Sequence, residues 1–131
     1  NLQLYYTNLR GFHWNVKGFQ FFGAHEKYEE YYDETADQID EVAERILMLG
    51  GVPSHNFSDY LKVSTIKETG VVSDPTAIAK HILDYLKELI AVEREVLELA
   101  SETNDEGTSA LVSDLISGHE KAVWMLTASL S

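Results

Sequence analysis

The chain contains no cysteine, two prolines and few basic residues, and each shortage excludes something. Without cysteine there is no disulfide framework and no thiolate metal site, so any metal must be bound by His, Asp or Glu. Ten Lys and Arg against 22 Asp and Glu give a net charge of −12, which fits phosphate backbones poorly. No apolar run reaches the roughly 18 residues of a membrane span, and no secretory signal is visible. We therefore expect a cytoplasmic protein that binds neither DNA nor a membrane through these residues.

What is present is helical periodicity. The length of 131 residues and the hydrophobic content of 44% are typical of a single globular domain, residues 1–131. Outside residues 50–75, apolar residues recur at helical spacing. They predict four helices, at 2–17, 21–49, 75–102 and 108–129. The first helix begins at once and without a cap, so we expect the domain to lack the start of this helix.

The connections indicate how these helices are joined. The link at 50–74 is long and contains an amphipathic piece at 57–62, whereas the other two links are short. Short links make neighbouring helices antiparallel, and a long central crossover lets the second and third helices run parallel. This predicts an all-α, ferritin-like four-helix bundle whose long central crossover contains a short helix. A generic up-down bundle with a long middle loop is the alternative. In the second helix we expect a core face made of Phe21, Tyr28, Tyr32, Ile39, Val42, Ile46 and Leu49.

Five residues form a candidate metal-ligand set. His13 lies near the end of the first predicted helix. The second helix carries His25 and Glu29, and later Asp40 and Glu44, each pair four residues apart and so on one side of the helix. Mixed imidazole and carboxylate ligands suit iron. Each pair alone is more often simply a solvated pair.

The spacing excludes one site within one chain. His25 and Asp40 are separated by about 22 Å along a helix that rises about 1.5 Å per residue, whereas metal–ligand bonds measure roughly 2 Å. Either the two pairs are unrelated half-sites, or two copies of the helix lie antiparallel across a two-fold axis and share each site.

Several runs resemble the Dps family of mini-ferritins, the DNA-protection proteins of starved bacterial cells, over essentially the whole chain. They are His13-Trp-Asn-Val-Lys-Gly18, Phe22-Gly-Ala-His25-Glu-Lys-Tyr-Glu29, Asp40-Glu-Val-Ala-Glu44-Arg45, Tyr60-Leu-Lys-Val-Ser-Thr-Ile66 and Trp124-Met-Leu126. The spacings of all five candidate ligands fit this family.

The resemblance implies a ferroxidase that forms a hollow dodecamer from two-fold dimers. Such a cage oxidises Fe(II), preferentially with hydrogen peroxide, and stores ferric mineral, which protects against oxidative stress. One subunit would supply His13, His25 and Glu29, and its mate Asp40 and Glu44. The family often has Asp at the position of Glu29, so the bond of Glu29 to iron is either direct or through water.

The resemblance assigns two further roles to acidic residues, with a solvated surface as the alternative. Residues that could face the cavity and nucleate mineral are Glu26, Glu30 and Asp33. Residues that could line an acidic entry pore, which would focus cations inward, are Asp105, Glu106 and Asp114. Trp14 is interpreted as a packing aromatic, or alternatively as an interceptor of oxidising equivalents. Surface or packing roles are expected for His55, His81 and His119.

Two other functions remain in competition with the ferroxidase. One is a DNA-compacting or protein-binding cage with little ferroxidase activity, and the other is a simple helical bundle with an interaction role. The intact ligand set argues against a vestigial site. The acidic balance, without a basic tail in the chain as given, argues against DNA compaction.

Overall fold

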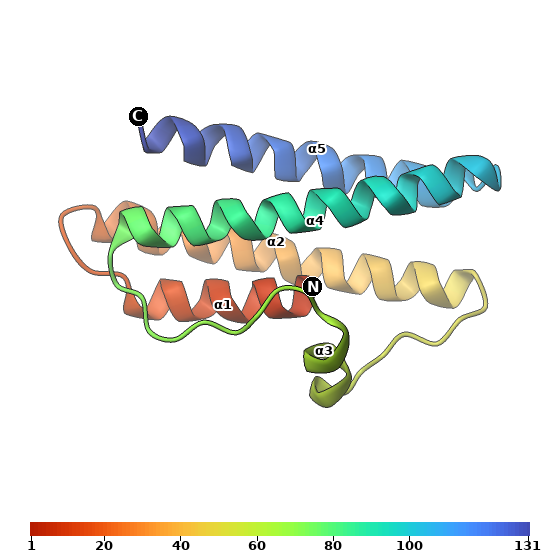
Figure 1. Cartoon of the computed structure of the whole chain (residues 1–131), viewed down its shortest axis with the longest axis horizontal. Helices are drawn as coiled ribbons and strands as arrows, with labels where there is room; N and C mark the ends of the chain where they lie inside the picture. Colours follow the sequence, from red (N-terminus) through yellow and green to blue (C-terminus); the bar gives the residue numbers. More distant parts are fainter. The chain divides into compact units, whose positions relative to one another are not determined.

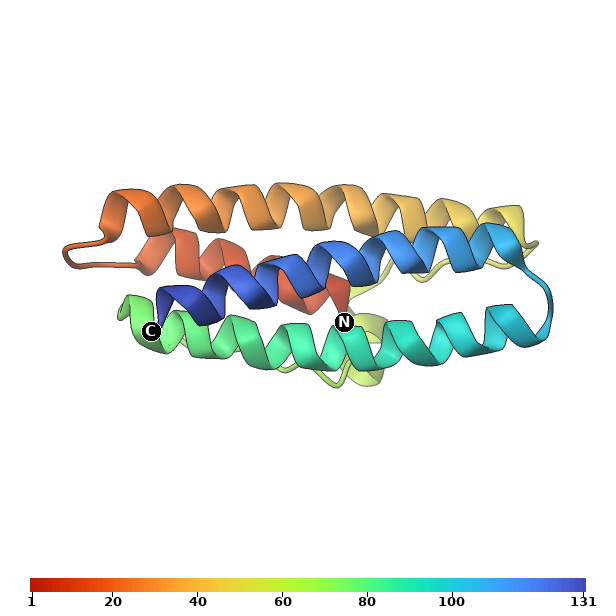
Figure 2. The same ribbon diagram turned by 90° about the horizontal axis from the view of Figure 1, so that it is seen from above.

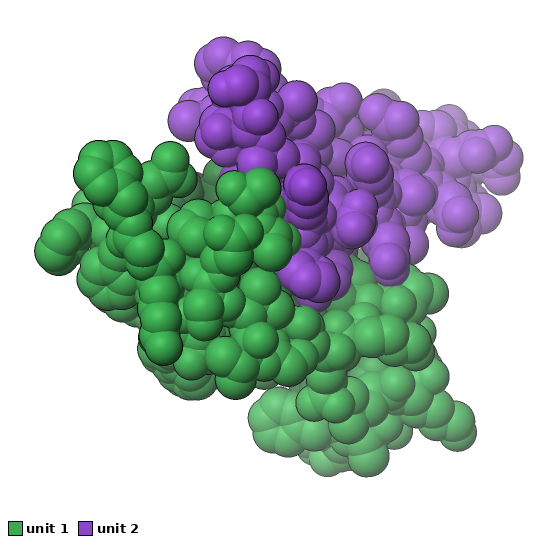
Figure 3. All heavy atoms as spheres, turned by 60° about the vertical axis from the view of Figure 1, so that its left-hand side comes forward, with its two compact units in different colours: residues 1–78 green, residues 79–131 purple.

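The computed structural model describes residues 1–131 as five α-helices without a strand. In chain order they are α1 (Leu2–Asn15), α2 (Phe21–Met48), α3 (Phe57–Val63), α4 (Pro75–Glu102) and α5 (Glu106–Ser129) (Figure 1). The chain divides into two compact units, residues 1–78 and 79–131 (Figure 3). None of the helices has the length and apolarity needed to cross a membrane.

In the first unit, α1 and α2 pack side by side and run in opposite directions (Figures 1 and 2). The turn between them contains Gly18 at a φ of +111°, a conformation that residues with a Cβ rarely adopt. Tyr5, Leu9 and Phe12 of α1 are almost fully buried. Burying a side chain of this size stabilises a fold by roughly 1.5–3 kcal/mol, so this face of α1 fixes how the helix sits on α2.

The end of α2 is a Schellman motif. The Gly51 amide donates to the Ile46 carbonyl over 2.9 Å, and the Gly50 amide to the Leu47 carbonyl over 3.0 Å. Gly50 has a φ of +87°, which the motif requires of the residue after the cap. The helix therefore ends at Met48 with Leu49 as its cap, which confirms the predicted end near residue 49.

Asn1 and Asn8 form hydrogen bonds with residues 64–67, the segment that follows α3. The Asn1 Oδ1 accepts from the Ser64 hydroxyl at 2.7 Å and from the Thr65 amide at 2.9 Å. The Asn8 side-chain amide donates to the Lys67 carbonyl over 2.9 Å. The segment that follows α3 is thus ordered by side-chain hydrogen bonds to α1.

The helix α4 begins in the first unit and continues into the second. Asp74 caps it, because the Asp74 Oδ2 accepts from the Ala77 amide at 2.9 Å. In the second unit α4 and α5 run antiparallel (Figure 2), joined by a turn in which Asn104 has a φ of +56°. Asp105 caps α5, so this helix begins two residues earlier than the predicted 108.

The predicted core face of α2 is wrong in its second half. The buried residues of α2 are Tyr28, Tyr31 and Thr35, whereas Ile46 and Leu49 are 36% and 59% exposed. A 14-residue α1 covers only the first half of a 28-residue α2. The second half of α2 therefore presents apolar side chains at the surface of the chain.

Candidate metal centre

His13 and His25 are brought together by the antiparallel packing of α1 and α2. His13 lies in the last turn of α1 and His25 in the second turn of α2. The His13 Nδ1 is 2.6 Å from the His25 carbonyl oxygen, and the His25 Nδ1 is 2.6 Å from the His13 carbonyl oxygen. The two rings stack at a centroid distance of 3.7 Å and an interplanar angle of 13°.

This exchange sets the tautomer of both histidines. A carbonyl oxygen only accepts hydrogen bonds, so each Nδ1 carries the proton and donates it. In the neutral imidazole the Nε2 then keeps its lone pair, which is the form that binds a metal. A histidine held through its other nitrogen is also fixed in orientation, so both rings are prepared as ligands before any metal arrives.

Aromatic rings enclose the stacked pair. The Phe21 ring stacks on His25 at 4.9 Å and 21°. The Tyr32 ring meets His13 nearly perpendicularly, at 5.4 Å and 81°. These contacts limit the rotation of both imidazoles and leave His13 only 8% exposed.

Glu29 lies one turn after His25 on α2 and is exposed. Its Oε1 accepts a hydrogen bond of 3.2 Å from the Tyr32 hydroxyl. Partial burial, followed by the charge of Glu29 and this hydrogen bond, raises the pKa of Tyr32, so the phenol remains a donor at neutral pH. The carboxylate therefore has one oxygen occupied and the other available.

Asp40 and Glu44 form a second pair near the far end of α2, where both are exposed. A hydrogen bond that the protonated Glu44 donates to Asp40, followed by the negative charge of Asp40, raises the pKa of Glu44. The two carboxyl groups therefore interact directly with each other.

Within one chain the five candidate ligands form two half-sites. His13, His25 and Glu29 lie at one end of α2, and Asp40 and Glu44 lie about 16–22 Å away along its axis. No group of three or more His, Asp or Glu side chains in the chain is placed to hold a metal ion. By itself, the chain therefore places the five candidate ligands in two separate groups and not in one site.

The other acidic candidates are placed less specifically. Glu26, Glu30 and Asp33 are exposed on α2, and Glu30 is paired with Lys27 at 2.7 Å. Glu106 and Asp114 are exposed on α5. The carboxylate of Asp105 accepts from both the amide and the hydroxyl of Thr108, so its role in this chain includes capping.

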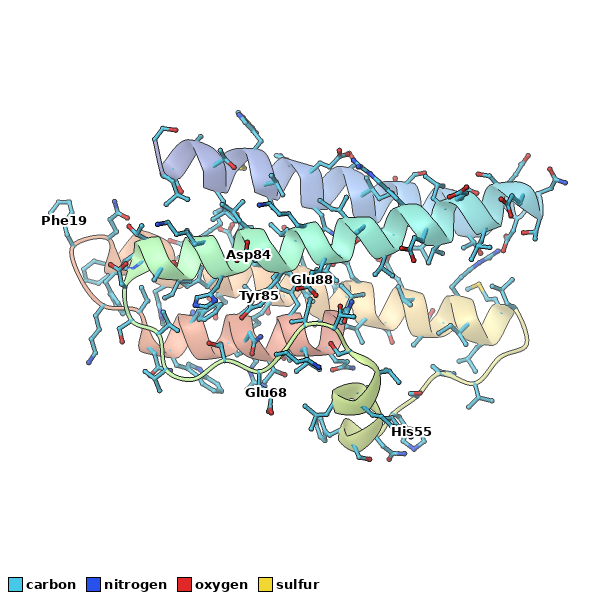
Figure 4. All side chains as sticks on the ribbon, in the orientation of Figure 1. Phe19, His55, Glu68, Asp84, Tyr85 and Glu88 are labelled. Carbon is cyan, nitrogen blue, oxygen red and sulfur yellow. The ribbon has the colours of Figure 1, made fainter.

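Four remaining side chains test the surface and packing assignments. Trp14 is 63% exposed with the Arg10 guanidinium 4.9 Å over its ring, so a packing role within the chain is wrong. Figure 4 shows His55 pointing away from the ribbon beside α3. His81 is half-buried and stacks on Tyr85 at a centroid distance of 6.2 Å and an angle of 27°. His119 is buried in the second unit, as a packing role requires, but its Nδ1 is also 2.5 Å from the Glu93 Oε1.

Sequence reasoning missed Tyr32, which was predicted to be a core residue. The structure makes it the hydrogen-bond partner of Glu29 and a ring neighbour of His13. The available signal was its spacing, because a residue three positions after Glu29 lies on the same side of the helix.

Comparison with known proteins identifies the family of the chain. A family model described as a ferritin-like domain matches residues 2–131. A "DNA protection during starvation protein" of Porphyromonas gingivalis is 51% identical over 98% of this chain and 80% of its own length. A second protein of that description, from Bacillus anthracis, is 40% identical over 96% of this chain and 86% of its own.

Solved structures show the same fold. The DPS protein of Vibrio cholerae O1, described as a member of a broad superfamily of ferritin-like diiron-carboxylate proteins, matches with a TM-score of 0.97 and 48% identity. This match covers 99% of the present chain and 82% of that one. A Dps protein from Bacillus brevis matches with a TM-score of 0.97 and 35% identity, over 100% and 88% of the two chains. The predicted all-α, ferritin-like fold is confirmed, and the chain belongs to the Dps family of ferritin-like proteins.

Proposed function

We propose that this chain is a ferroxidase and iron store, active in the bacterial cytoplasm, that oxidises Fe(II) at centres shared between two subunits. Iron storage and protection against oxidative damage are properties of the family. For this chain we add that hydrogen peroxide is the preferred oxidant and that ferric mineral is kept inside a dodecameric cage.

The observation that carries the proposal is the division of ligand types along α2. At one end, His13 of α1 and His25 of α2 keep their Nε2 atoms for a metal, beside the carboxylate of Glu29. The other end holds the carboxyl pair of Asp40 and Glu44. Two copies of α2 placed antiparallel across a two-fold axis bring opposite ends together and create two equivalent centres.

The exposed surface of α2 supports such a pairing. Beyond the part covered by α1, its side chains include Ile46, Leu47 and Met48, of which Leu47 and Met48 are 58% and 69% exposed. Apolar side chains gathered in this way are typical of a surface covered by another protein. A second copy of the chain would complete the ligand set and would also cover these apolar side chains.

The centre requires little of the protein beyond binding and orientation. Two Fe(II) ions give up one electron each to hydrogen peroxide, which takes up two protons and leaves as two water molecules. Imidazole and carboxylate ligands favour iron, and the added carboxylates stabilise the more highly charged Fe(III). Because both electrons come from paired iron, no hydroxyl radical is released.

The alternative is a DNA-compacting or protein-binding helical cage with little ferroxidase activity. The names of two relatives, which refer to DNA protection during starvation, are the reason to consider this alternative. Against it stands the net charge of −12, since a cage of such chains repels phosphate backbones.

Complementation between two defective chains tests the shared centre. His25→Ala and Asp40→Ala proteins should each assemble and show no accelerated oxidation of Fe(II) by peroxide, followed as ferric absorbance. Co-expressed in equal amounts, they should regain about a quarter of the sites, because random pairing joins one intact half of each type in that share of centres. His55→Ala, an exposed histidine away from both half-sites, should retain full activity.

Two outcomes would contradict the proposal. If assembled wild-type protein leaves the rate of Fe(II) oxidation unchanged, the proposed ferroxidase activity is wrong. If the two variants co-assemble into particles of normal size but regain no activity, the centres are not shared between subunits.

A further inference from the structure

Tyr32 contacts two of the three candidate ligands at the histidine end of α2. Its hydroxyl donates to the Glu29 Oε1 over 3.2 Å. Its ring meets the His13 ring at 5.4 Å, nearly perpendicularly. One side chain, which binds no metal itself, therefore joins a ligand on α2 to a ligand on α1.

The ring of Tyr32 is held in place from α1. Tyr6 meets it at 5.9 Å and 89°, and the Arg10 guanidinium lies 5.5 Å over the Tyr6 ring. With His13 and Tyr6 both against the ring, the direction of the Tyr32 hydroxyl is fixed by packing. The hydroxyl is thus a hydrogen-bond donor in a fixed position, which can orient a flexible side chain beside it.

Glu29 is such a flexible side chain. It is exposed on the surface of the chain, and a glutamate has one more rotatable bond than an aspartate. A free carboxylate at this position would populate several rotamers and would bind a metal through one oxygen or through both. The hydrogen bond from Tyr32 engages one of the two oxygens.

We propose that Tyr32 is a positioning residue of the metal centre, which holds the Glu29 Oε1 and so directs the Oε2 alone toward the metal. The inference rests on the proposed function, because it takes Glu29 as a ligand. Carboxylate ligands are commonly oriented by such hydrogen bonds, and loss of the partner typically weakens metal binding about 10- to 100-fold.

The competing explanation is that Tyr32 only packs between the helices. The Tyr32→Phe change separates the two, because it keeps the ring contacts with His13 and Tyr6 and removes only the hydroxyl. Tyr60→Phe is a matched control. It removes a hydroxyl with a hydrogen bond of the same 3.2 Å length, but to the Ser54 carbonyl near α3.

The test titrates the assembled protein with Co²⁺, whose visible absorption reports both binding and the number of coordinating atoms. Tyr32→Phe should weaken Co²⁺ binding by about 10-fold or more and lower the intensity of the visible bands, as Glu29 becomes free to bind through both oxygens. Tyr60→Phe should match the wild type. In a Glu29→Ala background, Tyr32→Phe should add nothing, since Tyr32 then has no carboxylate to orient.

The outcomes separate this inference from the proposed function. If Glu29→Ala binds Co²⁺ like the wild type, the ligand set is wrong and the positioning role falls with it. If Glu29→Ala weakens binding but Tyr32→Phe does not, only the positioning role is overturned. An equal loss from Tyr32→Phe in both backgrounds would also overturn it, because the hydroxyl would then affect binding without Glu29.

Discussion

His13 and His25 each donate the Nδ1 hydrogen to the other residue's backbone carbonyl, over 2.6 Å in both directions. Both acceptors are main-chain atoms, so they remain when either side chain is replaced. Each imidazole is therefore oriented independently of the other ring, although the two rings are stacked.

The first prediction concerns this independence. In His25→Ala protein, His13 should still carry its hydrogen on Nδ1 and keep Nε2 free, because the residue 25 carbonyl is still present. Solid-state ¹⁵N NMR of labelled histidine distinguishes the two tautomers. The reciprocal experiment on His13→Ala should give the same result for His25. A shift of the remaining ring to the Nε2–H tautomer would show that ring stacking, and not the carbonyl, fixes its state.

The second prediction concerns pH. The folded-state pKa of Glu44 is raised by Asp40, so this pair favours the folded chain below the ordinary pKa of a glutamate. The contribution is lost as pH rises through the raised value. Asp40→Asn removes the negative charge, and the pKa of Glu44 should fall toward its ordinary range. A ¹³C NMR titration of the Glu44 carboxyl measures this directly, and an unchanged midpoint would contradict the coupling.

The same proton affects metal binding. A cation that binds Asp40 and Glu44 competes with a proton on Glu44, so affinity should fall as pH falls through the raised pKa of Glu44. Zn²⁺ binding measured by calorimetry in two buffers of different ionisation enthalpy reports the protons released. In the Asp40→Asn protein fewer protons should be released on binding.

The third prediction concerns the buried pair of the second unit. His119 and Glu93 are both nearly inaccessible, and the His119 Nδ1 is 2.5 Å from the Glu93 Oε1. Glu93→Ala removes this acceptor from a buried donor and should lower the free energy of unfolding by about 1–3 kcal/mol. Glu93→Gln keeps an acceptor and should lose less. Urea midpoints at one protein concentration provide the comparison, and equal losses would indicate that charge matters more than the hydrogen bond.

The fourth prediction concerns the start of α5. Asp105 caps this helix by accepting from the Thr108 amide at 3.1 Å. Asp105→Ala should destabilise the chain by about 1 kcal/mol, and Asp105→Asn by less, because Asn also caps helices well. Thermal unfolding measures both. If the Asn variant instead admits iron to the cage more slowly at unchanged stability, the acidic pore role of Asp105 gains support.

The helix ends could be predicted closely because residues next to each end determine where the helix starts and stops. Gly50-Gly51 ends α2 through a motif that needs a positive φ, and Asp74 with Pro75 starts α4. At α5 the prediction began two residues late, because Asp105 rather than Thr108 is the cap. The two residues are only three positions apart, and both are residue types that cap helices.

The candidate site was only partly accessible from the sequence. The separation of the two half-sites followed from the helix rise alone. The exchange between His13 and His25 depends on how far α1 slides along α2, which side-chain packing decides. The hydrogen bond from Tyr32 to Glu29 depends on rotamers, and Tyr32 was assigned to the core because helical periodicity places an aromatic ring there.

The length of α2 also determines how a defective gene copy would behave in a cell that makes two versions of this chain. In the proposed pairing, each chain contributes its histidine end to one centre and its carboxylate end to another. A chain with one damaged end therefore removes centres in simple proportion to its abundance. A chain with both ends damaged inactivates both centres of its dimer. A centre is then intact only when both chains are normal, so the intact share falls with the square of the normal fraction. In an equal mixture with normal chains, a single lesion should accordingly leave about half of the centres intact and a double lesion about a quarter.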